Sequence, residues 1–410
     1  MLSPSHYTRN PHIAYAWLWI GGTPITVDDF SQRPRHLEAF SCHFDVEDMG
    51  SFSFQLFDPE YDFIEEQVAK SKGECTFQFG YTHGNKSPVY SGRILEYTPE
   101  FLYDGIRIHL RGMLEGLAFA KTQKTRAWPD TKISDIVKEI AANNGFKADV
   151  DDTKKVEFRE DLDLTELKHK KWNQHGSDWQ FMITKLQQQA VREKDGAGGY
   201  VLYIDAETKT LHFHPPRYEK GPIRTFVWRD KMTEVIRFSP TYQGNMMTTL
   251  FTGGLTAMPS QDAENSETKA NPQSMDKGDG KGFTTDPARN MARRPETQEE
   301  FQGQARGIKD WNDRYMAQNA AKFWWYRAMW MAAFEGELEV VGDPTIKPWE
   351  KYEVQVHKKT GGMHWTSGLY WCHGTDHKIE GGTYTTTLGL WRSDGETGEA
   401  PNARLVGGGG

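Results

Sequence analysis

Hydrophobic and polar residues alternate along much of the first 115 residues. The segments that do so are AYAWLWIGG, FSCHFDV, SFSFQLFD, ECTFQFGY, VYSGRILEY and GIRIHLRG, and Gly, Pro or Asp separates them. A period of two residues is typical of β-strands with one buried face. One helix is expected among them, from about Pro59 to Lys70, with Asp58 as its N-cap and Pro59 at its first position. Residues 1–120 therefore predict a small β-barrel or sandwich.

The pattern changes to helical spacing after residue 121. Ile133 to Asn143 is amphipathic, and Gly145 follows it in the position of a helix C-terminal stop. Ser177 and Gln180 have the spacing of a capping box and predict the start of a second helix. Two strands, YVLYID and TLHFH, follow and are joined by AETK. Residues 121–222 therefore predict an α+β domain.

Strand-like segments return from Ile223, and two different stretches interrupt them. FVWRD, VIRFS and MMTTLFTG, and later ELEVVGD, YEVQVH, LYWCHG and TYTTTLGL, predict a second β unit over 223–257 and 335–395. Residues 258–300 contain no Val, Ile, Leu, Trp or Tyr, so we expect a flexible insertion there. Aromatic residues at helical spacing predict a long helix over 301–334, and the polar tail 396–410 is expected to be flexible.

The chain contains an internal repeat. Ser91-Gly92 precedes Asp104-Gly105 by the same 13 residues by which Ser367-Gly368 precedes Glu380-Gly381, an offset of 276. Upstream, the triplet starting at Phe77 matches the triplet starting at Val354 at an offset of 277. Chance is the alternative, because β-hairpins share turn residues. A real repeat predicts a mainly β, α+β fold: two similar β-barrels with an α+β domain between them, and the insertion and long helix in the second.

Charge and apolar content limit the partners that we expect. Lys and Arg number 49 and Asp and Glu 57, a net charge of −8 that argues against non-specific binding of duplex DNA. The longest apolar runs, Ile13 to Ile20 and Phe323 to Phe334, are shorter than the roughly 20 residues of a membrane span. The N-terminus shows no apolar core of a secretory signal. We therefore expect a soluble intracellular chain without membrane insertion.

Motifs of catalysis and cofactor binding are largely missing from the sequence. It contains no HExxH, GxSxG, GxxxxGK(S/T) or strand-linked GxGxxG, so neither an enzyme nor a cofactor is expected. His212 and His214 stand two residues apart on one strand face and are weak candidates for a metal site. A convincing site needs three or four ligands, which favours structural roles for both.

The aromatic helix supplies the candidate interface residues. Trp324, Trp325 and Trp330 lie within KFWWYRAMWMAAF and point around much of the helix circumference. One helix cannot bury all of these rings in its own domain. We therefore expect some of them to face another subunit, where Trp is favoured.

Several segments together resemble the late control gene D family, the baseplate hub proteins of contractile-tailed bacteriophages. They are SFSFQLFDPEYDF…ECTFQFGY…VYSGRILEYTPEF with DGIRIHL, SDWQFMITKL with its two strands, and GELEVVGDPTIKPWEKYEVQV…SGLYWCHGTDHKIEGGTYTTTLGL. The resemblance covers most of residues 10–392 and rests on order and spacing. It matches nothing in the 258–300 insertion.

The resemblance implies an assembly and its partners. Two tail-tube-like barrels per chain would give a homotrimer with a pseudo-sixfold ring, which joins the hexameric tail tube to the trimeric central spike and lines the DNA channel. The implied partners are a tail tube or tube-initiator protein, the spike, and baseplate wedge and tape-measure proteins. The implied location is the virion tail baseplate, after assembly in the host cytoplasm.

Two other functions stay open at this point. One is a tail-associated peptidoglycan hydrolase or peptidase, for which the sequence offers no recognisable nucleophile or metal triad. The other is the equivalent hub of a tailocin or secretion-type injection device, which would share the same ring.

Overall fold

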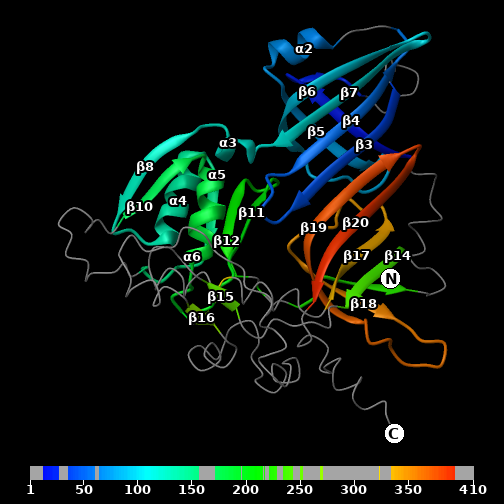
Figure 1. Cartoon of the computed structure of the whole chain (residues 1–410). Coiled ribbons are helices and arrows are strands. Elements are labelled where there is room, and N and C mark those ends of the chain that lie inside the picture. The colour runs from blue at the N-terminus through cyan, green and yellow to red at the C-terminus, as the bar shows by residue number, and fades with distance from the viewer. Residues whose placement is uncertain are drawn as a thin grey trace.

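The structure, a computed structural model, is mainly β and places an α+β domain beside a long sheet (Figure 1). Among the residues that the structure describes, no helix is long and apolar enough to cross a membrane. The described residues are 13–26, 36–60, 64–156, 171–194, 196–215, 217, 221–228, 234–242, 250–252, 268–270, 323 and 334–392.

The elements follow one another in the order strands, α+β domain, strands. The helical segments are α2 (Glu65–Lys70), α3 (Leu117–Ala120), α4 (Ile133–Asn143), α5 (Asp178–Phe181), a π-helical turn (Met182–Leu186) and α6 (Gln187–Gln189). The strands are β1 (Ala14–Ile20), β2 (Thr23–Pro24), β3 (His36–Asp45), β4 (Ser51–Asp58), β5 (Glu74–Tyr81), β6 (Tyr90–Leu102), β7 (Gly105–Leu114), β8 (Lys124–Pro129), β9 (Lys147–Val150), β10 (Lys171–Gly176), β11 (Val201–Asp205), β12 (Thr210–His214), β13 (Arg224–Trp228), β14 (Val235–Tyr242), β15 (Leu250–Thr252), β16 (Thr268–Ala270), β17 (Phe334–Val341), β18 (Lys351–Val356), β19 (Gly368–Glu380) and β20 (Thr383–Arg392).

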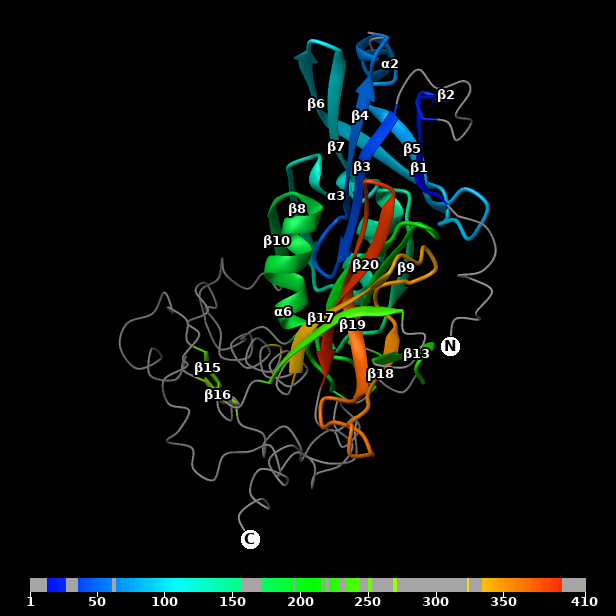
Figure 2. The ribbon, with the colours of Figure 1, turned by 90° about the vertical axis from the view of Figure 1, so that its right-hand side faces the viewer.

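One continuous sheet runs through both β units. Its order is β14-β17-β20-β19-β3-β4-β7-β6-β5-β1-β2, and β18 pairs with both β19 and β13. The ladder between β3 and β19, which we call the seam, joins the two halves, one above the other in Figures 1 and 2. No ladder among the described residues joins β1 to β3, so the first half is a curled open sheet. The second is likewise open within those residues, so the two β-barrels expected from the sequence are not closed there.

The hairpins β6–β7 and β19–β20 are two copies of one structure. Each has a strand of 13 residues, a two-residue turn and a strand of 10 residues. Each also has a β-bulge at the same point, at Leu95 in β6 and at His373 in β19. The offset between the copies is 278 residues, from Leu95 to His373, and not 276, because matching the DG and EG dipeptides ignored where each turn begins.

The repeat extends to the strands on both sides of the hairpin. Phe77 of β5 lies opposite Tyr90, as Val354 of β18 lies opposite Gly368, which confirms the predicted offset of 277. On the other side, β3 and β14 correspond at an offset of 198, and both carry a bulge, at Glu38 and at Ile236. The four-strand unit β3-β4-β7-β6 therefore recurs as β14-β17-β20-β19. The copies differ at their margin, where β1 is antiparallel to β5 but β13 is parallel to β18.

Each half has its own apolar core, and the seam contributes to the first. Phe40, Phe54, Phe77 and Leu110 pack in the first half together with Ile379, which comes from β19. A separate cluster around Phe226, Leu338 and Tyr370 forms the core of the second half. Because β19 buries Ile379 in the first core, the seam joins the two halves by side-chain packing as well as by the backbone ladder.

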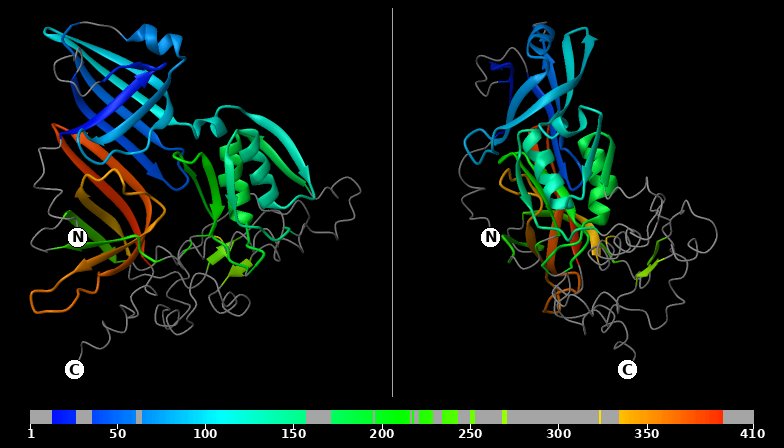
Figure 3. Two further views of the ribbon diagram at one scale, coloured as in Figure 1. Left: turned by 180° about the vertical axis from the view of Figure 1, so that it is seen from behind. Right: turned by 90° about the vertical axis from the view of Figure 1, so that its left-hand side faces the viewer.

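The α+β domain follows its sequence pattern closely and lies beside both halves (Figure 3). Helix α4 has the predicted bounds, and Gly145 follows it with a φ of +79°, which glycine adopts without strain. The Ser177 side chain accepts a hydrogen bond from the Gln180 backbone N–H, so it caps α5 as predicted. Strands β11 and β12 form the expected hairpin, and β9 pairs parallel to β12.

Direct contacts fasten this domain to both halves of the sheet. The Glu47 N–H, after β3, donates to the Leu202 carbonyl at 2.7 Å. The Tyr203 ring stacks on Trp349 of the second half with ring centroids 4.2 Å apart. Lys347 forms an ion pair with Glu207. The domain therefore bridges the seam from one side.

Two sequence predictions about helices have different outcomes. The helix predicted from Pro59 begins only at Glu65, and Asp58 ends β4 instead of capping α2. The Asp58 carboxylate accepts from the Glu60 N–H, which makes a local turn that competes with helix initiation. In the predicted aromatic helix, Phe323 is helical and buried, and Phe334 already opens β17. Trp324, Trp325 and Trp330 lie outside the described residues.

The insertion 258–300 and the tail 396–410 lie largely or wholly outside the described residues as well. Three residues of the insertion, Thr268–Ala270, form β16 and pair antiparallel with β15.

Candidate functional site

The seam carries polar contacts that link the two halves. Its register runs from Asp45 opposite Gly374 to Ala39 opposite Glu380. On its polar face, His43 Nδ1 donates to Asp376 Oδ1 at 2.6 Å. Beside the bulge of β19, His373 Nδ1 donates to Asp45 Oδ1 at 2.9 Å. These two contacts are ion pairs whenever the histidines are protonated.

Two histidines at the seam have opposite electrostatic surroundings. The hydrogen bond to Asp376 raises the pKa of His43 above its usual value, against the opposing effect of burial. His377 follows Asp376 in β19 and is fully buried, and this burial lowers its pKa to about 4. Its Nδ1 lies 2.9 Å from the Tyr384 hydroxyl oxygen. His377 is therefore a neutral core residue at physiological pH, whereas the contact with Asp376 favours the protonated form of His43.

The outer edges of the repeated unit lack described partners. Among the described residues, β6 pairs with β5 only through Tyr90–Arg93, and β14 pairs with β17 alone. Phe101 of β6 is 69% exposed, whereas its counterpart in the repeat, Ile379, is 2% exposed because β3 covers it. A side chain that is buried at the seam is thus exposed at the equivalent open edge.

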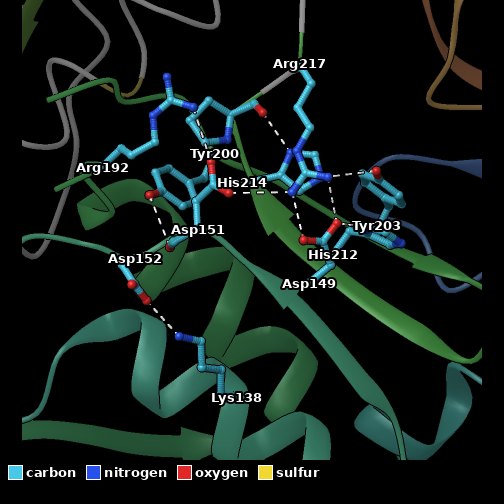
Figure 4. Close-up of polar contacts among 11 residues, drawn as sticks. Lys138, Asp149, Asp151, Asp152, Arg192, Tyr200, Tyr203, His212, His214 and Arg217 are labelled. Carbon is cyan, nitrogen blue, oxygen red and sulfur yellow. Dashed lines mark hydrogen bonds and ion pairs between the residues drawn. The ribbon is translucent and has the colours of Figure 1, made fainter. Parts of the chain in front are cut away.

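A polar cluster surrounds the two candidate metal ligands (Figure 4). His212 Nδ1 donates to Asp149 Oδ2 at 3.0 Å, and Arg217 donates two hydrogen bonds to the same carboxylate at 2.7 and 2.8 Å. These bonds, led by that from Arg217, lower the pKa of Asp149 to about 2. His214 Nδ1 donates to the Pro215 carbonyl at 2.7 Å, and its Nε2 accepts from the Tyr203 hydroxyl at 3.2 Å.

The geometry of this cluster favours an ion-paired clasp over a metal centre. One ligand atom each from Asp149, His212 and His214 lies within 4.8 Å of the others, close enough for one ion. The Arg217 guanidinium, however, already binds both oxygens of Asp149 and would repel a cation there. Burial lowers the pKa of His214 to about 4, so its ring is neutral and satisfied on both nitrogens. The arrangement holds the segment after β12 against β9.

Two hollows in the described structure offer no catalytic constellation. The larger, about 610 Å³, lies between the β5–β6 strands and α3, and its lining includes Cys75 and Arg93. Burial raises the pKa of Cys75 to about 12, so its thiol is not a nucleophile at neutral pH. Arg93 is already paired with Glu74. The smaller, about 170 Å³, adjoins the cluster of His212 and His214 and is lined in part by the stacked rings of Tyr203 and Trp349.

Sequence reasoning found part of these sites and missed the rest. It placed His212 and His214 on one strand face, and the structure adds Asp149 from β9 and Arg217 beyond β12. The helix α4 and the following strand pattern could have placed Asp149 on the neighbouring strand. The seam was missed altogether, because it pairs residues about 330 positions apart.

Comparison with solved structures identifies the architecture. A tail protein from Neisseria meningitidis MC58 matches with a TM-score of 0.58 and 13% identity over 95% of this chain and 99% of its own. The 43 kDa tail protein of prophage MuSo2 from Shewanella oneidensis matches with a TM-score of 0.58 and 12% identity, over 93% and 99%. The fold is that of phage tail proteins. No protein-family model and no curated protein sequence matches the chain.

A component of a secretion machine shares the fold at lower similarity. The E. coli c3393 protein, a component of the type VI secretion system with structural similarity to T4 tail proteins, matches with a TM-score of 0.50 and 12% identity. The match covers 92% of this chain and 78% of that one. The architecture is therefore common to phage tails and to a related secretion device.

Proposed function

We propose that this protein is a structural baseplate hub of a contractile tail, a member of the late control gene D group. In this proposal three chains form a homotrimeric ring with pseudo-sixfold symmetry, built from six tube-like units. The ring joins a hexameric tail tube, or its initiator protein, to a trimeric central spike. Baseplate wedge and tape-measure proteins are further partners, and the location is the virion tail.

One observation carries the proposal: the seam joins two copies of one four-strand unit edge to edge. The last strand of one copy, β19, pairs with the first strand of the other, β3. The same two kinds of edge recur at the ends of the run, on β6 and on β14, without described partners. Pairing β6 of one chain with β14 of the next would repeat the seam. A head-to-tail contact of this kind closes into a ring if the rotation per chain is one third of a turn.

The fold of the two tail proteins supports the tail assignment over an enzyme. A peptidoglycan hydrolase is the enzymatic alternative, and zymography on purified cell wall separates the two, because a hub clears none. The hub of a tailocin or secretion device is the nearer alternative. The fold shared with the type VI component supports it, and the gene neighbourhood decides between them, since only a phage carries capsid and terminase genes nearby.

A disulfide across the seam between chains tests the ring directly. Thr98 and Thr241 are the repeat counterparts of Asp376 and His43, which lie opposite each other in the seam. We therefore expect Thr98→Cys combined with Thr241→Cys to cross-link neighbouring chains under mild oxidation. With the tube and spike proteins of the same tail present, the product expected on a non-reducing gel is a covalent trimer of about 141 kDa, three times the 47.0 kDa chain.

A matched pair out of register controls for random collision. Thr98→Cys with Ser239→Cys shifts one cysteine by two residues along β14, so it is expected to cross-link poorly. Chains that stay monomeric in both variants, with the partner proteins present, would overturn the ring.

A further inference from the structure

Each open edge carries a proline, Pro99 on β6 and Pro240 on β14. If the proposed ring forms, these two prolines meet across the contact between copies. Pro99 of β6 corresponds to His377 of β19 at the offset of 278. Pro240 of β14 corresponds to Cys42 of β3 at the offset of 198. His377 and Cys42 lie directly opposite each other in the seam. Pro99 and Pro240 would therefore face each other in the seam between copies.

The direction of the backbone groups shows which side lacks a donor. The Val46 N–H donates to the His373 carbonyl across the seam at 3.0 Å. Because backbone groups alternate in direction along a strand, His377 and Cys42 also turn their N–H and C=O groups toward each other. The bulges of β6 and β19 keep the same parity, since the Ile94 and Cys372 N–H groups both point away from the hairpin partner. Pro99 and Pro240 thus turn their missing N–H toward the open edges.

The contact between copies would have Pro99 and Pro240 where the seam has His377 and Cys42, so it would lack two ladder hydrogen bonds. By the same alternation, three pairs of the seam register turn their N–H and C=O groups toward each other, and His377–Cys42 is the middle one of the three. Proline is tolerated on an edge strand because no partner there requires its N–H, and it discourages edge-to-edge pairing.

The side chains at the equivalent open positions weaken the same contact. The His43–Asp376 pair of the seam is replaced by Thr241 and Thr98, which carry no charge. The His373 partner of Asp45 is replaced by Leu95, which is 55% exposed. The apolar anchor, by contrast, is kept, because Phe101 and Phe238 take the places of Ile379 and Phe40.

We propose that Pro99 and Pro240 act as a brake on self-association. In the free chain the seam forms during folding, whereas the seam between copies is too weak to close the ring alone. The spike or the tube supplies the missing contacts, so that three chains close only on their assembly partner. The occupant of each open edge is a second copy of this chain.

The test uses the full-length chain by itself. Multi-angle light scattering over a concentration series gives the midpoint, which is the protein concentration at which the mass lies halfway between the 47.0 kDa monomer and a trimer. Pro99→Thr with Pro240→Thr restores both donors, and we expect the midpoint to fall at least about tenfold. Either single substitution restores one donor and is expected to give a smaller shift.

A proline elsewhere provides the control. Pro129 ends β8, pairs with Lys171 and is exposed, so Pro129→Thr makes the same chemical change away from the open edges. An unchanged midpoint in the double variant, with native circular dichroism, would overturn the brake. Mass that grows past a trimer without a plateau would overturn ring closure by these edges.

The two proposals fail in different ways. If the cysteine pair cross-links but the proline variant does not associate more tightly, the ring stands and the brake falls. If no variant associates and no cross-link forms with the partners present, the ring itself is wrong.

Discussion

His43 and Asp376 give the seam a dependence on pH. The folded-state pKa of His43 lies above the unfolded value of about 6.5, because Asp376 accepts its hydrogen bond. The stabilisation is therefore fully present below about pH 6.5 and is lost as the pH rises through the folded pKa. His43 and Asp376 side chains are 34% and 60% exposed, so we expect less than about 1 kcal/mol.

Urea unfolding of the wild type and of Asp376→Asn measures this contribution. The difference in free energy of unfolding between the two proteins should be larger at about pH 5.5 than at about pH 8.5, on either side of the unfolded pKa. A difference that does not vary with pH would show that Asp376 stabilises the seam without the charge of His43. Lys378→Gln, on the same face of β19, controls for loss of an exposed charge.

At the residue scale, the sequence predicted the cluster histidines but not what holds them. His212 and His214 were visible because they stand two apart in a strand pattern. Arg217 was not, since nothing in the local pattern shows that its side chain turns back onto Asp149. The open-edge prolines could have been noticed, because a proline inside a strand pattern indicates an edge.

At the element scale, β7 depends on a glycine opposite the bulge of β6. A Cβ on Gly112 would lie 2.3 Å from Phe52 Cζ and 2.4 Å from the Arg93 carbonyl oxygen. The backbone oxygen cannot move aside without disturbing the ladder. We expect Gly112→Ala to lower the free energy of unfolding by about 1–3 kcal/mol.

Gly221→Ala is the matched substitution, because a Cβ there meets nothing within 4 Å. Chemical denaturation of both variants provides the comparison. Equal stability of the two would mean that the β6–β7 hairpin is not packed tightly around its bulge.

Helix α4 and the two hairpins show which features of an element the sequence predicts and which it does not. Helix α4 matched its predicted bounds because apolar spacing and a terminal glycine agree. The hairpins were predicted, but their bulges were not, since one extra residue leaves little trace in a period-two pattern. The offset of 276 followed turn dipeptides, whereas the backbone aligns at 278 through the bulges.

At the scale of the whole molecule, the four-strand units have one buried and one polar face. The core and strands β1 and β5 cover the buried face of the first unit, and in the ring that we propose these elements would take the outer side. The polar face would then line the channel. Its arginines are paired with carboxylates: Arg107 with Glu38 and Glu100, Arg111 with Glu96, and Arg237 with Glu337 and Glu339.

Among the described residues of this face, the paired arginines form no continuous basic stripe that could hold DNA. Reversing the charge of their partners tests this. Glu337→Lys with Glu339→Lys would add positive charge to β17 and release Arg237. We expect the assembled wild-type ring to leave duplex DNA unretarded in a gel shift, and the variant ring to retard it in a salt-dependent way. Glu65→Lys with Glu66→Lys on α2 makes the same charge change elsewhere and is expected to retard DNA much less. Equal retardation by both variants would contradict the prediction, because it would show that the added charge acts alike on the polar face and on α2.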